Sequence, residues 1–507
     1  MVKFDIVGLM PYAVILTIMG IFLELGMWLP AKTYRRLWSI ITLAVVVLAS
    51  MVMALNYFNV YLMLFLVIAI YRIINLSRYI LQRRQADHLY SVTRQTSSWL
   101  LAVQLLSLGL ATAASPLLIH TGVLSLIAVG FVGGIIIYLS TARNLKKTRP
   151  SKIAALTVND SAPTLSVLIP ARNETDDLYA CLQSLVKSTY PKLEILVLDD
   201  NSQNKRTPEI IKDFAQDGVR FLAGKNVPSN WLAKNYAYQQ LLENASGDLL
   251  LFCGVDTRFK PETLAIMVSE LLQKKKTMIS FIPANIAPNA WEYKSLLVQP
   301  SRYCWELGLP RRTFKRPPVL STAWLINHVS LREAGSFKAV TRAAIPERMF
   351  AEFTAKHNDG YSFLQSDTAH GVASAKSFSE QKATSVRLRY PQLHQSIELT
   401  ALVSILEIAV LILPFLVWPI FIIKHNDFLL LINIISCILL VISYALVVKI
   451  TYRSFLIRSI WMLPLAAVYD VVLLNYSMYK YEFSTVEWKG RNACIPVMQV
   501  IDRLPQT

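Results

Sequence analysis

Long apolar runs alternate with polar segments along the chain, and their positions divide it into three parts. A helix needs roughly 20 apolar residues to cross the hydrocarbon of a bilayer. Five runs that approach this length precede residue 145, and three more follow residue 395. The third run is short, so the segment around Asn56 and Asn59 is predicted to form either a tight hairpin or one re-entrant element. The eight runs lie at residues 7–29, 37–55, 57–71, 98–118, 122–141, 399–423, 428–450 and 456–478.

The part between these two groups of runs has the pattern of an α/β domain. Short apolar segments end on polar groups at residues 166–174 (SVLIPARNE) and 195–202 (ILVLDDNS). A helix of about four turns is predicted from the Trp-Leu-x-Lys-Asn sequence that begins at Trp231, and Gly247–Asp248 then turns into a strand from Leu249 to Cys253. Ligands of open α/β sheets bind at the carboxyl ends of such strands. The acids at three strand ends therefore predict one shared site.

Composition identifies the class of protein. Hydrophobic residues make up 54% of the 507 residues and the mean hydropathy is +0.41, which predicts an integral membrane protein with several spans. We expect about five spans in residues 1–145, an inserted α/β domain at 146–395, two or three spans at 396–480, and a tail at 481–507. The five cysteines are scattered with no pair at metal-ligand spacing, so neither a disulfide framework nor a zinc site is indicated.

The positions of Lys and Arg predict how the chain is oriented. These residues cluster after the first, third and fifth apolar runs, whereas the hairpins at 56–59 and 116–122 contain none. Positive charge favours the cytoplasmic side in short loops, so we expect the N-terminus outside the cell and residues 145–395 in the cytoplasm. The net charge of +18 fits basic loops that lie against anionic lipid headgroups. Nucleic-acid binding is not expected, because the basic residues follow the membrane boundaries.

The last apolar run leaves the topology open. Three C-terminal spans would place residues 488–491 (WKGR) outside the cell, away from the α/β domain. The same run contains Pro464, Asp470 and Asn475, which a membrane-spanning helix accommodates poorly. The alternative is that this run lies along the membrane interface without crossing it.

Five motifs in order, SVLIPARNE, LDDNS, WLAKN, GDLLLFCGVD and the WKGR tail, resemble those of family 2 glycosyltransferases. The resemblance covers residues 164–392 and 488–491. It is strongest to the membrane-bound branch that glycosylates lipids such as carotenoid acids, hopanoids and ceramide. It implies a GT-A fold, which is Rossmann-like with a mostly parallel sheet, and transfer of a sugar from a nucleotide sugar.

The resemblance implies that Asp256 is a metal ligand. Sugar transfer needs the leaving diphosphate neutralised, and Mg²⁺ or Mn²⁺ on a carboxylate usually does this. The family has Asp-x-Asp at this point, whereas this chain has Gly254-Val255-Asp256. The alternative is that Asp256 merely caps a helix that begins near Lys260 or Pro261.

The resemblance also implies a nucleotide site. Its acids are Glu174, Asp199 and Asp200, of which the last accepts hydrogen bonds from the uracil of a UDP donor in the family. An Asx-turn is the alternative reading of Asp-Asp-Asn-Ser. Lys234 is expected to approach the diphosphate, with Trp231 and Asn235 shaping its loop; a solvated surface lysine is the alternative.

The catalytic base is where the chain departs most from the family pattern. The family places Glu-Asp before a short helix and uses the Asp as base, whereas this chain has Glu347-Arg348. A guanidinium cannot act as a base near neutral pH. Either Glu347 serves one residue early, with Arg348 lowering its pKa, or Glu352 serves, or transfer is lost.

Acceptor contacts are expected from two further segments. Arg389 and Tyr390 are the counterparts of the family's Gln-x-x-Arg-Trp, and the alternative is an amphipathic stretch whose arginines meet lipid phosphate. Trp488 and Arg491 belong to the WKGR tail. Glu24 and Glu407 lie in or near apolar runs, and the sequence names no partner for either.

The sequence thus predicts an inverting, metal-dependent glycosyltransferase that moves a sugar from a nucleotide sugar, expected to be a UDP-sugar, to a membrane lipid at the cytoplasmic leaflet. A catalytically degenerate scaffold or subunit is the main alternative, since three family motifs are altered together. A processive synthase is a third reading. The oligomeric state is left open.

Overall fold

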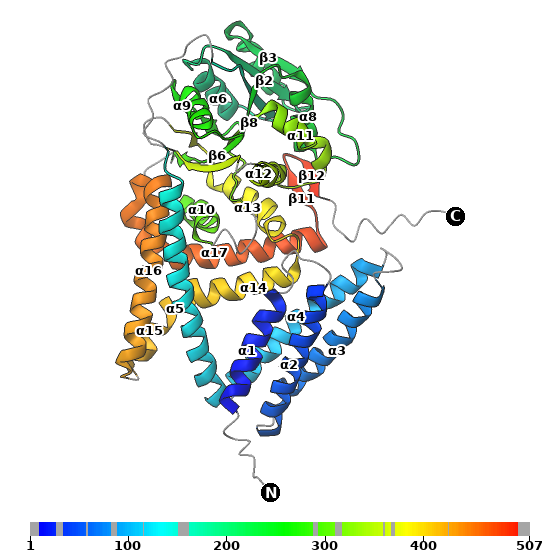
Figure 1. The fold of residues 1–507 in the computed structure, drawn as a ribbon, viewed down its shortest axis with the longest axis vertical. Coiled ribbons are helices and arrows are strands. Elements are labelled where there is room, and N and C mark those ends of the chain that lie inside the picture. Colours follow the sequence, from blue (N-terminus) through cyan, green and yellow to red (C-terminus); the bar gives the residue numbers. More distant parts are fainter. Residues whose placement is uncertain are drawn as a thin grey trace, which may run out of the picture.

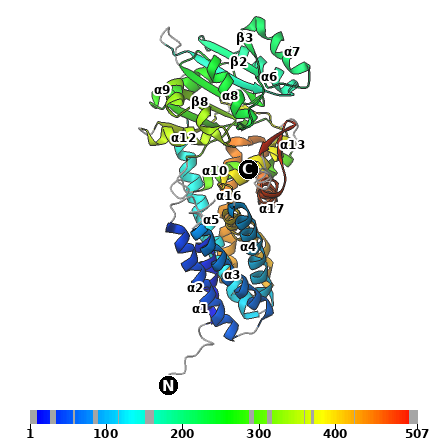
Figure 2. The same ribbon diagram turned by 90° about the vertical axis from the view of Figure 1, so that its right-hand side faces the viewer.

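The computed structural model describes residues 10–26, 34–56, 59–82, 89–114, 116–150, 162–286, 293–309, 317–357, 360–366, 371–423 and 425–494. An α/β domain lies at one end of the molecule and a group of long helices at the other (Figure 1). Helices α10, α13 and α17 lie between these two parts in both views (Figures 1 and 2).

Five helices form the N-terminal part. Helix α1 packs on α2 and α3 packs on α4. The third apolar run forms a helix of 23 residues, so the predicted re-entrant element is wrong. Asn59 starts that helix by accepting a hydrogen bond from the Tyr61 N–H at 2.8 Å. The five helices are α1 (Met10–Gly26), α2 (Tyr34–Asn56), α3 (Val60–Gln82), α4 (Leu89–Ala113) and α5 (Pro116–Lys147).

The C-terminal helices include the other long apolar segments. Four helical segments of the described chain are long and apolar enough to cross a membrane, at 123–147, 397–423, 427–451 and 459–483. The second of these is bent, because a π-helical turn, η5, separates its two halves. Which side of a membrane the α/β domain faces stays a prediction. The elements are α14 (Ile397–Glu407), η5 (Ile408–Ile412), α15 (Leu413–Ile423), α16 (Asp427–Thr451), η6 (Arg453–Phe455) and α17 (Leu456–Phe483).

Helix α17 lies crosswise to α5 and α16, directly below the α/β domain (Figure 1). The turned view agrees, since α17 is seen there nearly end-on (Figure 2). This arrangement returns the tail to the α/β domain, where it forms a hairpin of β11 (Val486–Trp488) and β12 (Arg491–Cys494). Whether the last apolar run crosses a membrane or lies along its surface stays a prediction, since residues 459–483 are long and apolar enough to span.

The α/β domain is built on a seven-stranded sheet in the order β3-β2-β1-β4-β8-β6-β9. Every neighbouring pair is parallel except those of β8, which runs antiparallel to β4 and β6. This confirms the predicted α/β class with a mostly parallel sheet. All seven residues of β1 are buried, as expected of a central strand covered on both faces. The strands are β1 (Leu165–Ala171), β2 (Leu193–Asp199), β3 (Val219–Ala223), β4 (Leu249–Cys253), β6 (Met278–Ile282), β8 (Ala323–Asn327) and β9 (Tyr361–Gln365).

Helices cover both faces of the sheet. Apolar side chains of α6 (Asp176–Val186), α7 (Arg206–Asp213) and α9 (Thr263–Gln273) form one core with it. Those of α8 (Ala233–Asn244), α11 (His328–Glu333) and α12 (Pro346–Lys356) form the other. The second core continues through α10 (Gln299–Gly308) into α16, so the domain is packed firmly onto the apolar helices.

A small sheet and helix α13 complete the edge of the domain that faces the apolar helices. The small sheet has the order β5-β10-β7 and lies next to the end of β4. A capping box between Ser377 and Glu380 starts α13. The remaining elements are β5 (Thr257–Arg258), β7 (Ala284–Asn285), β10 (Ala373–Ser374), α13 (Phe378–Gln392), η2 (Ala215–Asp217), η3 (Tyr293–Leu297) and η4 (Phe337–Val340).

Candidate active site

The acids that end the strands lie on one edge of the sheet, because β2, β1 and β4 are adjacent and parallel. Asp199 is the last residue of β2, Asp200 follows it, and Asp256 comes three residues after β4 ends at Cys253. Helix α8 between β3 and β4 has 12 residues, about one turn shorter than predicted.

Asp256 contacts residues of the domain that are distant from it in the sequence. Its Oδ2 lies 3.4 Å from the Nζ of Lys376 and accepts a hydrogen bond from the Ser374 hydroxyl at 3.3 Å. Burial opposes ionisation, but Lys376 and these hydrogen bonds hold the pKa of Asp256 below its usual value. Helix α9 begins only at Thr263, with Glu262 at its N-cap, so the helix-capping alternative for Asp256 is wrong.

Gly254 stands where the family has the first acid of Asp-x-Asp. A Cβ at this position would lie 2.5 Å from the Oδ1 of Asp256. That oxygen is the end of a flexible side chain, which can turn aside for a larger residue. The geometry at Gly254 therefore does not account for the missing acid.

A divalent cation fits this site only in a limited way. No group of three or more His, Cys, Asp or Glu side chains gathers in the described part of the chain to enclose a metal ion. Mg²⁺ needs fewer protein ligands, because it commonly keeps its waters and binds one or two carboxylates together with substrate phosphates. Asp256 suits that kind of ion, provided that phosphate oxygens complete the coordination.

Glu347 is the second carboxylate of the site. It lies in the first turn of α12, after Pro346, where the helix dipole favours an anion. The residue is 2% exposed, and its Oε2 has no hydrogen-bond partner within the described residues. Its charge acts on Lys234, Arg302 and Arg387, which come from three different helices.

The side chain of Arg348 contacts residues other than Glu347. Its Nε donates to Glu352 Oε1 at 3.0 Å, and its Nη2 lies 3.1 Å from His394 Nε2. The side chain of Arg348 is thus engaged by Glu352 and His394. Glu352, the other candidate base, is already engaged by Arg348.

Four cations interact electrostatically with the two carboxylates. Glu347 acts on Lys234, Arg302 and Arg387, whereas Lys376 acts on Asp256. Lys234 is also repelled by the other three cations, which are Arg302, Lys376 and Arg387. The cations outnumber the carboxylates even when Glu306, which borders Arg302, is included. We call these four cations with Asp256 and Glu347 the charged cluster. Its excess positive charge suits an anionic ligand.

Burial and nearby positive charge both act on Lys234. Burial, followed by the repulsion of Arg387, Lys376 and Arg302, lowers the pKa of Lys234 to about 8, although Glu347 opposes this shift. Burial likewise lowers the pKa of Arg302 and of Arg387. Lys234 is partly buried, so the solvated-lysine alternative is wrong. The cluster is therefore destabilised in its free form, and binding of an anion would relieve the repulsion.

Two residues of the WLAKN motif support the cluster. The Asn235 side chain donates to the carbonyl oxygens of Val340 at 2.8 Å and Ala343 at 2.9 Å, which ties α8 to the loop before Glu347. Trp231 makes an edge contact with Tyr236, with ring centroids 5.5 Å apart. Asn235 thus connects α8 to that loop, whereas the role expected of Trp231 stays a prediction.

The WKGR tail lies over the first two strand ends. Lys489 Nζ is 2.9 Å from Glu174 Oε1, and Arg491 Nη1 is 2.7 Å from both carboxylate oxygens of Asp200. Arg172 connects the strand end to the tail, because its guanidinium donates to the carbonyl oxygens of Asp200 at 2.6 Å and of Lys489 at 3.0 Å. Burial raises the pKa of Glu174 and of Asp200, although their basic partners oppose it.

The other tail and turn residues complete this edge. Asp199 accepts a hydrogen bond from the Ser202 N–H at 3.2 Å, as in the turn reading of Asp-Asp-Asn-Ser. Trp488 is in β11, but its side chain lies outside the described part of the structure. The side chain of Glu24 is likewise outside it.

Arg389 and Tyr390 do not belong to the charged cluster. Arg389 is paired with Glu407 at 3.1 Å and with Asp470, and its guanidinium lies 4.9 Å from the centre of the Trp305 ring. Tyr390 is fully buried, and its hydroxyl donates to Glu482 and to the Gln395 carbonyl. Neither residue is exposed to meet lipid phosphate, so that alternative is wrong. Glu407, for which the sequence named no partner, is held by Arg389.

Three residues of the cluster were missed by sequence reasoning. Arg387 is in the same VRLRY segment as Arg389, but residues two apart on a helix do not share a face. Arg302 and Lys376 lie in no motif that was recognised. Arg302 lies in α10 and Arg387 in α13, helices that are buried for much of their length, whereas Lys376 precedes α13. None of these placements has a signal in the sequence.

Comparisons with known proteins bear on the family of the α/β domain. Residues 166–335 match the family described as Glycosyl transferase family 2. The probable glycosyltransferase YdaM of Bacillus subtilis is 32% identical over 138 residues, 26% of this chain and 30% of that protein. The 4,4'-diaponeurosporenoate glycosyltransferase of Staphylococcus haemolyticus is 29% identical over 140 residues, 27% of this chain and 36% of that protein.

Two solved structures are also similar. The mannosyltransferase PcManGT of Pyrobaculum calidifontis, in complex with GDP-Man and Mn²⁺, has a TM-score of 0.43 and 15% identity, over 71% of this chain and 99% of that one. Residues 1–349 of S. aureus TarS in complex with UDP have a TM-score of 0.30 and 15% identity, over 65% and 95%. Both TM-scores are below 0.5, so neither structure assigns a residue of this site.

The mostly parallel sheet agrees with the family match. Residues 166–335 are a family 2 glycosyltransferase domain. The matched segments span about a third of the length of the two curated relatives, 30% and 36%. What the whole chain does is therefore proposed below.

Proposed function

We propose that this protein is an inverting glycosyltransferase that moves a sugar from a nucleoside diphosphate sugar, expected to be a UDP-sugar, to a membrane lipid. The charged cluster carries the proposal. It combines an excess of cations, which suits a diphosphate, with a buried carboxylate that can accept a proton. Asp256 of the charged cluster follows the end of β4, and ligands of such sheets bind at strand ends.

Lys234, Lys376, Arg302 and Arg387 are proposed to hold the diphosphate. Negative charge grows on the leaving phosphate oxygen as its bond to the sugar breaks, and fixed cations in a partly dry site stabilise that charge. Asp256 is the residue that would hold a divalent ion, which would neutralise the diphosphate further. Lys376 would then exchange its partner, from Asp256 to a phosphate oxygen.

Glu347 is proposed to be the general base. A hydroxyl or carboxyl oxygen of the acceptor attacks the anomeric carbon from the face opposite the diphosphate. The new carbon–oxygen bond forms as the bond to the phosphate oxygen breaks, and the electron pair leaves with the diphosphate. A hydroxyl acceptor gives its proton to Glu347. Attack from the opposite face inverts the configuration at that carbon.

Glu174, Asp199 and Asp200 are proposed to face the nucleoside. Lys489 and Arg491 partner two of these acids, so the tail would form part of the nucleoside pocket.

The lipid acceptor is supported by the apolar helices packed beneath the domain and by the name of the Staphylococcus haemolyticus relative. We further propose that the domain faces the cytoplasm, as the distribution of basic loops indicates.

Donor-dependent release of UDP tests the function directly. The purified protein in lipid nanodiscs would be incubated with a panel of nucleotide sugars, Mn²⁺ or Mg²⁺, and total lipid from the producing organism. We expect release of the nucleoside diphosphate together with one new glycolipid. Absence of release with every donor would favour the scaffold alternative, and products with long sugar chains would favour a processive synthase.

A further inference from the structure

Pro391 leaves a backbone carbonyl of α13 without its usual helical partner. The residue lies inside this helix, one position before the last residue, Gln392. In an α-helix the carbonyl of one residue accepts a hydrogen bond from the N–H four residues later, so the carbonyl of Arg387 would pair with residue 391. Proline has no N–H, and the Arg387 carbonyl therefore needs a donor from elsewhere.

Helix α17 supplies that donor. The hydroxyl of Tyr481 donates a hydrogen bond to the Arg387 carbonyl at 2.7 Å. One turn earlier in α17, the hydroxyl of Ser477 donates to the carbonyl of Val386 and accepts from the N–H of Tyr390 at 3.1 Å. Val386 and Tyr390 are four residues apart, which is the spacing of hydrogen-bond partners in a helix. Two side chains of α17 thus bind the backbone of the turn that carries Arg387.

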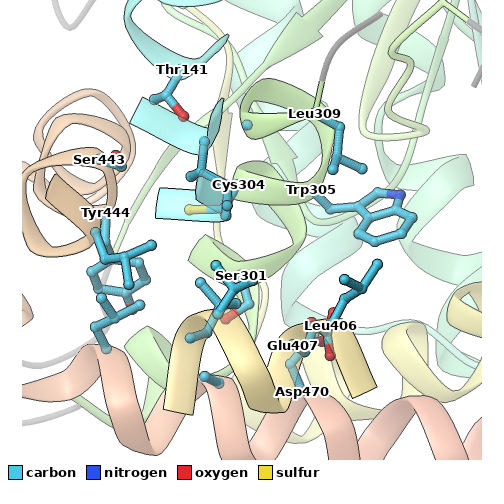
Figure 3. A pocket seen from close by; sticks show the side chains of 18 of the residues that line it. Thr141, Ser301, Cys304, Trp305, Leu309, Leu406, Glu407, Ser443, Tyr444 and Asp470 are labelled. Atoms are coloured by element: carbon cyan, nitrogen blue, oxygen red, sulfur yellow. The ribbon is translucent and has the colours of Figure 1, made fainter. Parts of the chain in front are cut away.

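One face of α17 makes all of these contacts. Ser477 and Tyr481 are four residues apart, so they lie on the same side of the helix, and they are 0% and 3% exposed. Asp470, seven residues before Ser477, is on this side too and forms an ion pair with Arg389. Figure 3 shows Asp470 next to Glu407, the other acid that pairs with Arg389. This face of α17 therefore holds both the backbone and a side chain at the end of α13.

The turn held by α17 carries one of the cations of the charged cluster. The charges of Glu347 and Asp256 act on the guanidinium of Arg387. Arg389, two residues later, pairs with Asp470 instead. Each residue of a helix is rotated from the previous one by roughly 100°, so a small rotation of this turn would move the Arg387 side chain away from the cluster. The direction of its guanidinium therefore depends on the contacts that hold the backbone of the turn.

We propose that Tyr481 and Ser477 are positioning residues for the donor diphosphate, because they fix the turn of α13 from which the Arg387 guanidinium reaches the phosphate oxygens. The inference rests on the proposed function, in which Arg387 holds the diphosphate, and adds to it how that guanidinium is directed. Both residues act through Arg387. Helix α17 is long and apolar enough to cross a membrane, so a helix of the apolar part contributes to the geometry of the donor site.

Removal of the two hydroxyls tests the inference in the full chain, purified in lipid nanodiscs. Tyr481→Phe removes the donor to the Arg387 carbonyl and keeps the ring, and Ser477→Ala removes the neighbouring hydroxyl. Loss of one charge-assisted hydrogen bond to phosphate corresponds to about tenfold weaker binding, so each variant should raise the UDP Kd by about that factor. The Kd of uridine, which has no phosphate, should not change. A UDP Kd equal to that of the parent in both variants would overturn the inference.

Each variant has a matched control on α17. Ser459→Ala removes a hydroxyl that is 0% exposed and bonds within its own helix, to the carbonyl of Leu456. Tyr479→Phe removes a hydroxyl from a side chain that is 52% exposed. Neither control should change the UDP Kd. An equal rise of the Kd in the controls would show a general disturbance of α17 and would count against the inference.

A double-mutant cycle with Arg387→Met separates positioning from damage to the fold. If Tyr481 acts through Arg387, Tyr481→Phe should weaken UDP binding in the parent and have no further effect in the Arg387→Met background. Equal weakening in both backgrounds would show that Tyr481 supports the fold alone, and the inference would be wrong. Melting temperatures identify the folded variants. Ser477→Ala replaces Tyr481→Phe in the cycle if the latter does not fold.

The same measurements distinguish failure of the inference from failure of the proposed function. Weaker UDP binding by Arg387→Met, with no effect of Tyr481→Phe or Ser477→Ala, would overturn the inference and leave the proposed function in place. An unchanged UDP Kd in Arg387→Met would overturn the proposed diphosphate site, and the inference with it.

Discussion

The carboxylate of Asp256 and the ammonium of Lys376 form an ion pair, with Oδ2 and Nζ 3.4 Å apart, at the place where the donor diphosphate is proposed to bind. The pair joins the turn after β4 to the segment after β10, which are remote in the sequence. It means that Asp256 is already neutralised before any substrate or metal arrives. Metal binding to Asp256 therefore competes with Lys376.

Asp256→Asn tests whether this carboxylate holds a metal. The amide keeps the size of the side chain, so the fold should persist, but metal-dependent donor binding should be lost. Calorimetric titration with UDP and Mn²⁺ measures this. The same UDP affinity and the same metal dependence in variant and parent would contradict the assignment.

Lys376→Met is the companion variant. It should raise the affinity of the protein for Mn²⁺ in the absence of UDP, because the competing ammonium is gone.

Donor binding should weaken as the pH rises through about 8, because the pKa of Lys234 is lowered to about 8. Below that pH the side chain is an ammonium that attracts the diphosphate, and above it the charge is lost. One lost charge-assisted hydrogen bond should raise the UDP Kd by about tenfold. Lys234→Arg, which stays protonated, should flatten this dependence between pH 7 and 9. A parent protein with a flat profile would exclude Lys234 from the diphosphate site.

Lowering of the Lys234 pKa also affects stability. The folded protein releases this proton near pH 8, whereas the unfolded chain keeps it up to the ordinary lysine value of 10.5. The unfolded state then binds more protons between these values, so this group makes folding more favourable as the pH rises across that window. Thermal unfolding of the parent and of Lys234→Met at several pH values would measure the difference.

Glu347→Gln should reduce transfer by about a hundredfold or more, the usual scale for loss of a general base, with UDP binding unchanged. Glu352→Gln is the matched control on the same helix, and it should have a much smaller effect because Glu352 pairs with Arg348. Single-turnover transfer kinetics would compare them. If Glu352→Gln were the more damaging variant, the base would be misassigned.

Arg348→Asp restores the family sequence but is not expected to raise the rate. In the structure the side chain of Arg348 reaches Glu352 and His394, so an aspartate there would lose an ion pair and place two acids four residues apart. Activity created from nothing by this variant would favour the degenerate-scaffold reading.

Arg491 and Asp200 should be energetically coupled. Arg491→Gln removes the cation from an acid that is 1% exposed, so the variant should unfold at lower temperature and bind UDP more weakly. Adding Asp200→Asn should restore part of the lost stability. A double-mutant cycle should give a coupling energy of about 0.5–3 kcal/mol. Additive effects of the two substitutions would show that the tail does not support the strand end.

Membrane topology is testable with single cysteines. In a background without the native cysteines, Lys225→Cys lies on the exposed surface of the α/β domain and Ala114→Cys at the exposed end of α4. Membrane-impermeant maleimide applied to intact cells should label residue 114 and not residue 225. Labelling of residue 225 from outside would overturn the proposed orientation.

Local pattern was sufficient to predict much of the fold. The strand from Leu249 to Cys253 was predicted at the bounds that the structure shows, because a short apolar run between turn residues has few other solutions. Asp199 and Asp256 were placed at strand ends for the same reason, and parallel pairing of β2, β1 and β4 then brings them to one edge. The lengths of the third apolar run and of α8 were predicted less well, since helix ends depend on caps and packing.

Only the tertiary structure determines which charged side chains lie next to each other. Arg387 and Arg389 look equivalent in the sequence, but the first faces Glu347 and Asp256 while the second is held between Glu407 and Asp470. Lys376 reaches Asp256, and the tail reaches Asp200, only because the chain returns to the same sheet edge. The sequence thus determined the strands, the apolar helices and the acids at the strand ends, which follow from local periodicity. The partners of those acids depend on packing between distant segments, because electrostatic pairing depends on distance in space and not on distance along the chain.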